Sequence, residues 1–143
     1  MKSIQLVTWQ IVAIICILIT GPLVPSRPGS IVLIVFGILI GSWGIIEIHR
    51  RSRFSVLPEV HPEGKLVTSG PFRIVRNPMY LALLVAAAGY VLDELNLYRI
   101  GFFIFLTVIL VRKIEIEERQ LLRRFPEYKD YAKRTSRLLP FIW

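Results

Sequence analysis

The amino-acid sequence predicts an all-α, polytopic membrane protein with about four transmembrane helices and a cytoplasmic amphipathic C-terminal helix. Three observations support this fold class: apolar residues come in four blocks, charged residues fall between the blocks, and nearly all basic residues lie on one side of the resulting topology. Of the 143 residues, 54% are hydrophobic, although the net charge is +8. A chain of this length has room for one domain, which we take to be residues 1–143.

The four apolar blocks define the expected spans. A helix rises about 1.5 Å per residue and the hydrocarbon core is about 30 Å thick, so roughly 20 residues cross it. The first two blocks meet this length, and we interpret the shorter last two as a hairpin that turns at residues 93–96. The expected spans are residues 4–23, 30–48, 78–92 and 96–111. A cleaved signal peptide is disfavoured for the first block, because the block is longer than a typical signal core and no Ala-x-Ala site follows it.

Proline and glycine mark the ends and faces of the first two helices. Pro22, Pro25 and Pro28 end the first helix and form a short turn, since proline cannot continue a helix. Gly37 and Gly41 lie four residues apart in the second block. Small residues at this spacing let two helices approach closely, so they predict a packing face.

The basic residues set the expected orientation. With four spans, the N-terminus, the segment between the second and third spans, and the tail from residue 112 share one side of the membrane. That side carries 16 of the 18 basic residues, leaving Arg27 and Arg99 elsewhere. The positive-inside bias makes it cytoplasmic, so both termini are expected there. Topology and anionic lipid explain the basic excess, and we expect no nucleic-acid partner.

Several kinds of site are missing from the sequence. Cys16 is the only cysteine, and His49 and His61 stand alone, so no group has metal-ligand spacing and we expect no metal. No Gly-x-Gly-x-x-Gly or phosphate-loop pattern occurs. Any cofactor must therefore be held by loops beside the membrane.

The first informative segment is 64–80. Ser69-Gly70-Pro71 predicts a tight turn, and Asn77-Pro78 predicts the start of the third helix, with Asn77 as N-cap. Helix capping alone would explain an asparagine at position 77. The free N–H groups of the same helix start can also bind a carboxylate or phosphate, helped by Arg76.

The second informative segment is 112–131, followed by the apolar end of the chain. Apolar residues recur there at helical spacing among charges, which predicts an amphipathic helix that continues the fourth span or lies on the membrane surface. Lys113 and Glu117 are four residues apart, as are Glu115 and Arg119. Ordinary ion pairing on the helix surface accounts for such spacing.

Together the two segments resemble the integral membrane methyltransferases that include isoprenylcysteine carboxyl methyltransferase and the phospholipid N-methyltransferases. The first carries Leu-Val-Thr-x-Gly, an aromatic residue, and Arg-Asn-Pro-x-Tyr; the second carries Glu-Glu-x-x-Leu, Phe, two tyrosines and a late proline. The resemblance covers about residues 64–143. It implies that S-adenosylmethionine is held between the loop 52–77 and the tail 112–143 near the cytoplasmic surface.

The resemblance implies site residues at the positions of this sequence that match the family's motifs. The implied cofactor-binding residues are Lys65, Leu66, Val67, Phe72, Asn77, Pro78, Met79, Tyr80 and Glu117. The implied catalytic residues are Arg76, Lys113 and Glu117, with Lys113 and Arg112 facing the substrate. Two positions depart from the carboxyl methyltransferases: Asn77 replaces a histidine, and Lys113 replaces an arginine. The lysine lacks the bidentate fork that suits a substrate carboxylate.

The resemblance implies methyl transfer from S-adenosylmethionine to a lipophilic, membrane-soluble acceptor, such as an isoprenylcysteine-type carboxylate or a related small lipid. Such a transfer is an in-line displacement, so positioning and desolvation supply much of the rate and no catalytic triad is needed. Amine methylation of a phospholipid head group is one alternative. A non-enzymatic helical scaffold that binds anionic lipid is the other.

Overall fold

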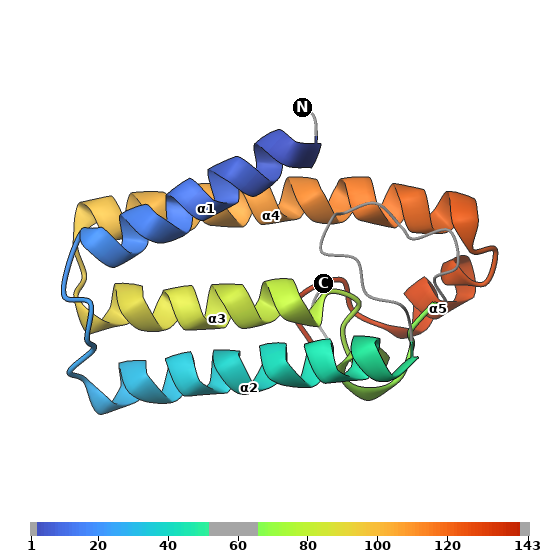
Figure 1. Ribbon diagram of the computed structural model, residues 1–143, viewed down its shortest axis with the longest axis horizontal. Coiled ribbons are helices and arrows are strands. Elements are labelled where there is room, and N and C mark those ends of the chain that lie inside the picture. Colours follow the sequence, from blue (N-terminus) through green and yellow to red (C-terminus); the bar gives the residue numbers. More distant parts are fainter. Residues whose placement is uncertain (1–2, 52–65, 141–143) are drawn as a thin grey trace. The chain divides into compact units, whose positions relative to one another are not determined.

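The computed structural model describes residues 3–51 and 66–140 of the chain. These residues form helices α1 (Ser3–Ile19), α2 (Pro28–Arg51), α3 (Pro78–Asp93), α4 (Leu97–Arg124) and α5 (Tyr128–Arg134), with a short 3-10 helix, η1 (Gly70–Arg73) (Figure 1). Within the described ranges the sole β-type pairing outside the helices is an isolated bridge between Val75 and Ser136. The all-α prediction is confirmed for these ranges.

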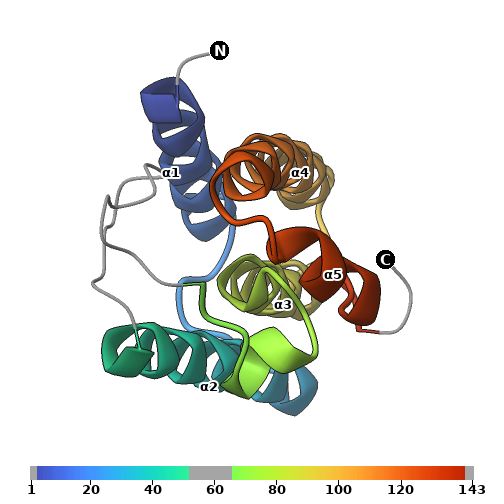
Figure 2. The same cartoon turned by 90° about the vertical axis from the view of Figure 1, so that its right-hand side faces the viewer.

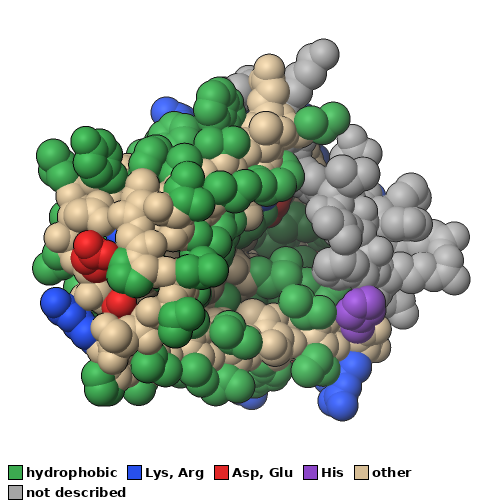
Figure 3. All heavy atoms as spheres, turned by 60° about the vertical axis from the view of Figure 1, so that its left-hand side comes forward, with side chains coloured by type: hydrophobic (Ala, Val, Ile, Leu, Met, Phe, Trp, Pro, Cys, Tyr) green, Lys and Arg blue, Asp and Glu red, His purple; other side chains and the backbone are tan. Residues whose placement is uncertain are grey.

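One described helix, α2, is long and apolar enough by itself to cross a membrane. Its apolar side chains face outward, and those of Val32 and Leu39 are 65% and 61% exposed, which is unlike the core helix of a soluble protein. Residues 4–19 and α3 are apolar but shorter. Hydrophobic side chains also predominate on the face shown in Figure 3.

Helix boundaries differ from the expected spans at two places. The first helix ends at Ile19, not at residue 23, because Gly21 and Pro22 follow two and three residues later and proline disfavours helical conformation in the residue before it. The fourth helix does not stop at residue 111 but runs on to Arg124. The charged segment therefore continues the fourth apolar helix, which decides between the two placements that the sequence allowed. The expected turn at residues 93–96 lies between α3 and α4.

The chain divides into two compact units, which we name the α1 unit (Met1–Leu39 with Ala82–Lys113) and the α5 unit (Ile40–Leu81 with Ile114–Trp143). In the α1 unit, α1 lies beside α4 and α2 beside α3 (Figure 1). Its core consists of buried residues from three helices: Leu6, Ala13, Ile17, Ala82, Ala87, Val91, Leu106, Ile109 and Leu110. These are small or branched apolar residues, as close helix packing requires.

Glycine sets the contact between α2 and α3 in the α1 unit. A Cβ added to Gly37 would lie 2.7 Å from the Ala82 carbonyl oxygen, and one added to Gly89 would lie 2.8 Å from that of Ser30. Any side chain at either position would push the two backbones apart. The packing face predicted at Gly37 is confirmed.

A buried polar cluster closes one end of the α1 unit. The Arg99 side chain is fully buried, and it donates hydrogen bonds from three nitrogens to the carbonyl oxygens of Ile17, Tyr90 and Pro22. The Asp93 carboxylate accepts from the backbone N–H groups of Ser26 and Arg27. Side chains from the hairpin thus bind carbonyl groups in the last turns of α1 and α3 and N–H groups ahead of α2.

Candidate functional site

The α5 unit brings the two informative segments together. The backbone N–H of Arg76 donates to Ser136 (2.8 Å), and that of Ser136 donates to Ile74 (3.1 Å), which makes the parallel bridge between Val75 and Ser136. The Asn77 side-chain amide donates to the Arg137 carbonyl oxygen at 2.9 Å. Figure 2 shows η1, α5 and the start of α3 gathered at the end nearest the viewer. The segment ahead of α3 is therefore joined to the C-terminal tail within one compact unit.

The turn predicted at Ser69-Gly70-Pro71 is present and is anchored to the end of α2. Gly70 has φ of +58°, a value that favours glycine, and the Phe72 N–H donates to the Ser69 carbonyl at 3.2 Å. The Ser69 hydroxyl donates to the Glu47 carboxylate, which also accepts from Arg51 Nε at 2.6 Å. A buried carboxylate on α2 thus holds the turn in place.

Asn77 occupies the predicted N-cap position. The third helix begins at Pro78, and the Leu81 N–H donates to the Asn77 carbonyl at 3.1 Å. Because the side-chain amide of Asn77 also binds the tail through Arg137, capping is only part of what this residue does.

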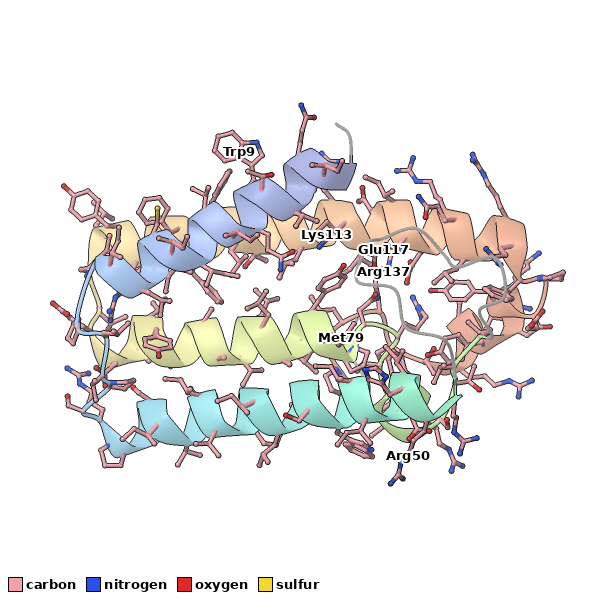
Figure 4. The ribbon with its side chains drawn as sticks, in the orientation of Figure 1. Trp9, Arg50, Met79, Lys113, Glu117 and Arg137 are labelled. Atoms are coloured by element: carbon pink, nitrogen blue, oxygen red, sulfur yellow. The ribbon has the colours of Figure 1, made fainter. Side chains whose placement is uncertain are left out.

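Tyr80, on the first turn of α3, donates its hydroxyl to Glu117 Oε1 on α4 at 2.5 Å. Both side chains are half-buried. Figure 4 shows Glu117 and Arg137 together between the ribbons of this unit, with Met79 at the start of α3, whereas Arg50 points away from α2. The Tyr80–Glu117 contact places an acidic oxygen beside the first turn of α3.

A second carboxylate, Glu118, has a different set of partners. Its Oε1 accepts from Arg76 Nε at 2.8 Å and its Oε2 from Arg137 Nε at 2.9 Å. Arg76 Nη1 also donates to the carbonyl oxygens of Ala132 and Thr135. The buried carboxylate therefore joins two arginines from different segments.

Two tyrosines of α5 pack beside this cluster, with ring centroids 5.6 Å apart. The Tyr131 hydroxyl donates to the Phe72 carbonyl at 2.6 Å, and burial raises the pKa of Tyr131 to about 12. Burial and the Glu118 carboxylate also raise the pKa of Tyr128. Both hydroxyls keep their protons at physiological pH and act as neutral donors.

The implied cofactor-binding residues lie largely in the α5 unit, which holds Leu66, Val67, Phe72, Asn77, Pro78, Met79, Tyr80 and Glu117. Lys65 lies outside the described residues. Pro78 is buried, Met79 is exposed, and the other six are half-buried. The Phe72 carbonyl and the Asn77 side chain are hydrogen-bonded to the C-terminal segment. The part of the chain that the structure describes holds no group of three or more metal-ligand side chains.

Of the three implied catalytic residues, the α5 unit contains Arg76 and Glu117. Lys113 is the last residue of the α1 unit, where its ammonium donates to Gln10 Oε1 at 2.7 Å. The implied substrate residue Arg112 is an exposed member of the same unit. Glu115 and Arg119 form the expected surface ion pair, at 3.9 Å.

The sequence did not single out Glu118. The only signal was the Glu-Glu pair, and adjacent residues on a helix point about 100° apart, so the two carboxylates reach different partners. Glu117 meets α3 through Tyr80, and Glu118 meets the arginines. Which of the pair turns toward which segment depends on tertiary packing.

Comparison with known proteins gives a family match. The model of the family described as phospholipid methyltransferase matches residues 28–128. A probable protein-S-isoprenylcysteine O-methyltransferase of Oryza sativa subsp. indica is 28% identical over 116 residues, covering 79% of this chain and 60% of the rice protein. A methanethiol S-methyltransferase of Pseudomonas deceptionensis is 28% identical over 132 residues, covering 83% of this chain and 49% of that protein.

A further similar protein is named for metal resistance and not for methyl transfer. The nickel-cobalt-cadmium resistance protein NccN of Alcaligenes xylosoxydans xylosoxydans is 33% identical over 78 residues, covering 53% of this chain and 36% of that protein. The chain thus spans between about a third and three fifths of the length of these relatives.

Proposed function

Because the chain belongs to the phospholipid methyltransferase family, we propose that it transfers a methyl group from S-adenosylmethionine to a lipophilic acceptor in the membrane. The observation that carries the proposal is the contact between the two informative segments inside the α5 unit. Asn77 binds the tail there, and Tyr80 binds Glu117. These are positions that the resemblance assigns to the donor.

The side chains of the α5 unit suit the donor chemically. The donor is a sulfonium cation that supplies the methyl group when bound. Glu117 offers a carboxylate to a positive charge, and the aromatic rings of Phe72 and Tyr80 offer faces for a cation or an adenine. Leu66 and Val67 are half-buried and apolar. We propose these residues, with Asn77, Pro78 and Met79, as the donor site, and Arg76 and Glu117 as residues that act on the bound reactants.

We further propose four spans, with both termini and the donor site on the cytoplasmic side. The exposed apolar surface of α2 supports a membrane-embedded chain. The charge distribution supports the orientation, since Arg50, Arg51 and the basic residues of α5 all belong to the α5 unit. A water-soluble donor then reaches the site from the cytoplasm, while a lipophilic acceptor reaches it through the bilayer.

A lipophilic carboxylate is the first candidate acceptor, and the similarity to the rice protein supports it. A phospholipid amine is the second, and the description of the matching family supports that. The resemblance assigns Lys113 to the acceptor, but its ammonium cannot bind a carboxylate with two parallel bonds as a guanidinium does.

Binding of S-adenosylhomocysteine to the detergent-purified protein tests the enzymatic proposal. We expect micromolar affinity by calorimetry, lost in Glu117→Ala because the carboxylate that faces Tyr80 is removed. Glu115→Ala is the matched control, since Glu115 lies on the same helix and pairs only weakly with exposed Arg119. Absence of heat with the folded wild-type protein would favour the lipid-binding scaffold instead.

The acceptor class has its own experiment. Methyl-labelled S-adenosylmethionine is incubated with the protein and a total lipid extract, and the labelled lipids are treated with mild base. A carboxyl methyl ester releases the label, whereas a methylated amine retains it. Label that base removes supports the carboxylate, and base-stable label supports the head-group amine.

A further inference from the structure

We propose that Glu118 is a positioning residue, whose carboxylate holds the C-terminal tail against the segment ahead of α3 and so sets the affinity of the site for the methyl donor. The inference rests on the proposed function, because it concerns the same site. It assigns a role to the second glutamate of the Glu-Glu pair, which the resemblance did not place in the donor site. Glu118 is 7% exposed, which is unusual for a carboxylate without partners.

The geometry around Glu118 is that of a two-sided clamp. One oxygen binds Arg76, which precedes α3, and the other binds Arg137, which follows α5. The side chains of Arg76 and Glu118 are only 10% and 9% exposed, so solvent screens this pair poorly. Without the carboxylate, the two guanidinium groups would lose the anion that both of them bind.

The two arginines join elements that also meet through the backbone. The Arg76 N–H donates to the Ser136 carbonyl within the parallel bridge between Val75 and Ser136, and Asn77 donates to the Arg137 carbonyl. Arg76 Nη1 additionally binds the carbonyls of Ala132 and Thr135, at the end of α5. The clamp therefore fixes the start of α3 through side-chain and backbone bonds to one short stretch of tail.

The link to the donor runs through adjacent residues. Asn77, held by the tail, begins the helix that carries Tyr80, and Tyr80 binds Glu117, the neighbour of Glu118 on α4. One turn of α4 thus ties both the start of α3 and the tail. Weakening the Glu118 ion pairs is expected to lower the affinity for the donor without removing a group that touches the donor.

Glu118→Gln tests the clamp while keeping the size of the side chain. The amide keeps one acceptor oxygen where the carboxylate had two, and its N–H₂ group then faces the guanidinium that the other oxygen bound. Glu115→Gln is the matched control, an equivalent change on the same helix at an ion pair of 3.9 Å whose side chains are 68% and 32% exposed. Hydrogen exchange at the amides of Arg76 and Ser136 reports the bridge directly and needs no activity.

We expect these two amides to exchange at least about tenfold faster in Glu118→Gln and to be unchanged in Glu115→Gln, as for loss of a charge-assisted hydrogen bond. The Kd for S-adenosylhomocysteine and the KM for the donor should rise about 10-fold to 100-fold, with kcat at saturating donor within about threefold of wild type. Glu118→Asp, which keeps the charge on a shorter side chain, should recover part of the affinity.

Arg137→Lys supplies a milder perturbation of the same clamp, in case Glu118→Gln does not fold, and should show the same changes in smaller measure. Unchanged exchange in both variants would overturn the clamp. Faster exchange with unaltered donor affinity would overturn the positioning role and leave Glu118 a purely structural ion-pair partner. Failure of the wild-type protein to bind S-adenosylhomocysteine would overturn the proposed function and the positioning role with it, while the exchange rates would still show whether Glu118 holds the tail.

Discussion

Arg99→Met removes a fully buried guanidinium from the α1 unit and leaves three backbone carbonyls without their donor. Arg99 Nε donates to Ile17 (3.1 Å), Nη1 to Tyr90 (2.8 Å) and Nη2 to Pro22 (2.9 Å). Methionine fills much of the same volume but donates no hydrogen bond. The ends of α1 and α3 then lose the group that joins them.

The size of the effect follows from these three bonds. A buried acceptor left unsatisfied costs about 1–3 kcal/mol, which gives roughly 3–9 kcal/mol for three. Side-chain hydrogen bonds measured in a membrane protein average only about 0.6 kcal/mol, which gives roughly 2 kcal/mol. Removing the guanidinium also relieves a desolvation cost of several kcal/mol. We therefore expect a net loss of roughly 3 kcal/mol, toward the low end of the range.

Unfolding of detergent-solubilised protein by added SDS, followed by far-ultraviolet circular dichroism, measures this loss. Arg27→Met is the matched control, because Arg27 is exposed at the same end and its side chain makes a 3.3 Å contact with the Leu92 carbonyl. We expect it to change stability by less than about 0.5 kcal/mol. If Arg99→Met proved no less stable than Arg27→Met, the cluster would not be what joins these helices.

Gly21→Ala tests the placement of the Arg99 guanidinium without changing Arg99 itself. A Cβ at Gly21 would lie 2.4 Å from Arg99 Cζ, whereas one at Gly29 would meet nothing within 4 Å. Gly21→Ala should therefore displace the guanidinium and destabilise the protein with the same sign as Arg99→Met. Gly29→Ala should leave stability nearly unchanged. Equal stability of the two alanine variants would count against the tight placement of Arg99.

Two further outcomes are expected. Gly37→Ala should lower the SDS midpoint by an amount corresponding to about 1–3 kcal/mol, since its Cβ would press on the α3 backbone. Gly101→Ala should leave the midpoint unchanged, because a Cβ there meets nothing within 4 Å. Equal midpoints for the two variants would refute the close approach of α2 and α3. The pKa of Tyr131 is raised from 10.0 to about 12, so this hydroxyl holds its proton more tightly in the folded protein than in the unfolded chain. Its contribution to stability is therefore complete below about pH 10 and is lost as pH rises toward 12. Thermal unfolding between pH 9 and 12 should show a shallower loss in Tyr131→Phe than in wild type, and identical slopes would refute this assignment.

Local sequence signals located much of the candidate site. Asn77-Pro78 and Ser69-Gly70-Pro71 predicted a helix start and a turn that the structure contains, because capping and positive φ depend on a few neighbouring residues. The apolar blocks predicted all-helical structure because every backbone polar group in lipid must be satisfied internally. Helix ends were placed less well, since α1 ends at Ile19, ahead of Gly21 and Pro22, and α4 continues past residue 111 to Arg124.

The sequence by itself determined the helices, their apolar character, the turn ahead of α3 and the residue types available to the donor site, because each follows from local propensity and hydrophobic pattern. Only the tertiary structure decided that Arg99 is buried and bonded to three carbonyls, and that Glu117 meets Tyr80 while Glu118 meets two arginines. A charged side chain looks the same in sequence whether it is solvated or buried. Its partners lie 42 residues away for Glu118 and Arg76 and 82 for Arg99 and Ile17, distances at which only packing brings groups together.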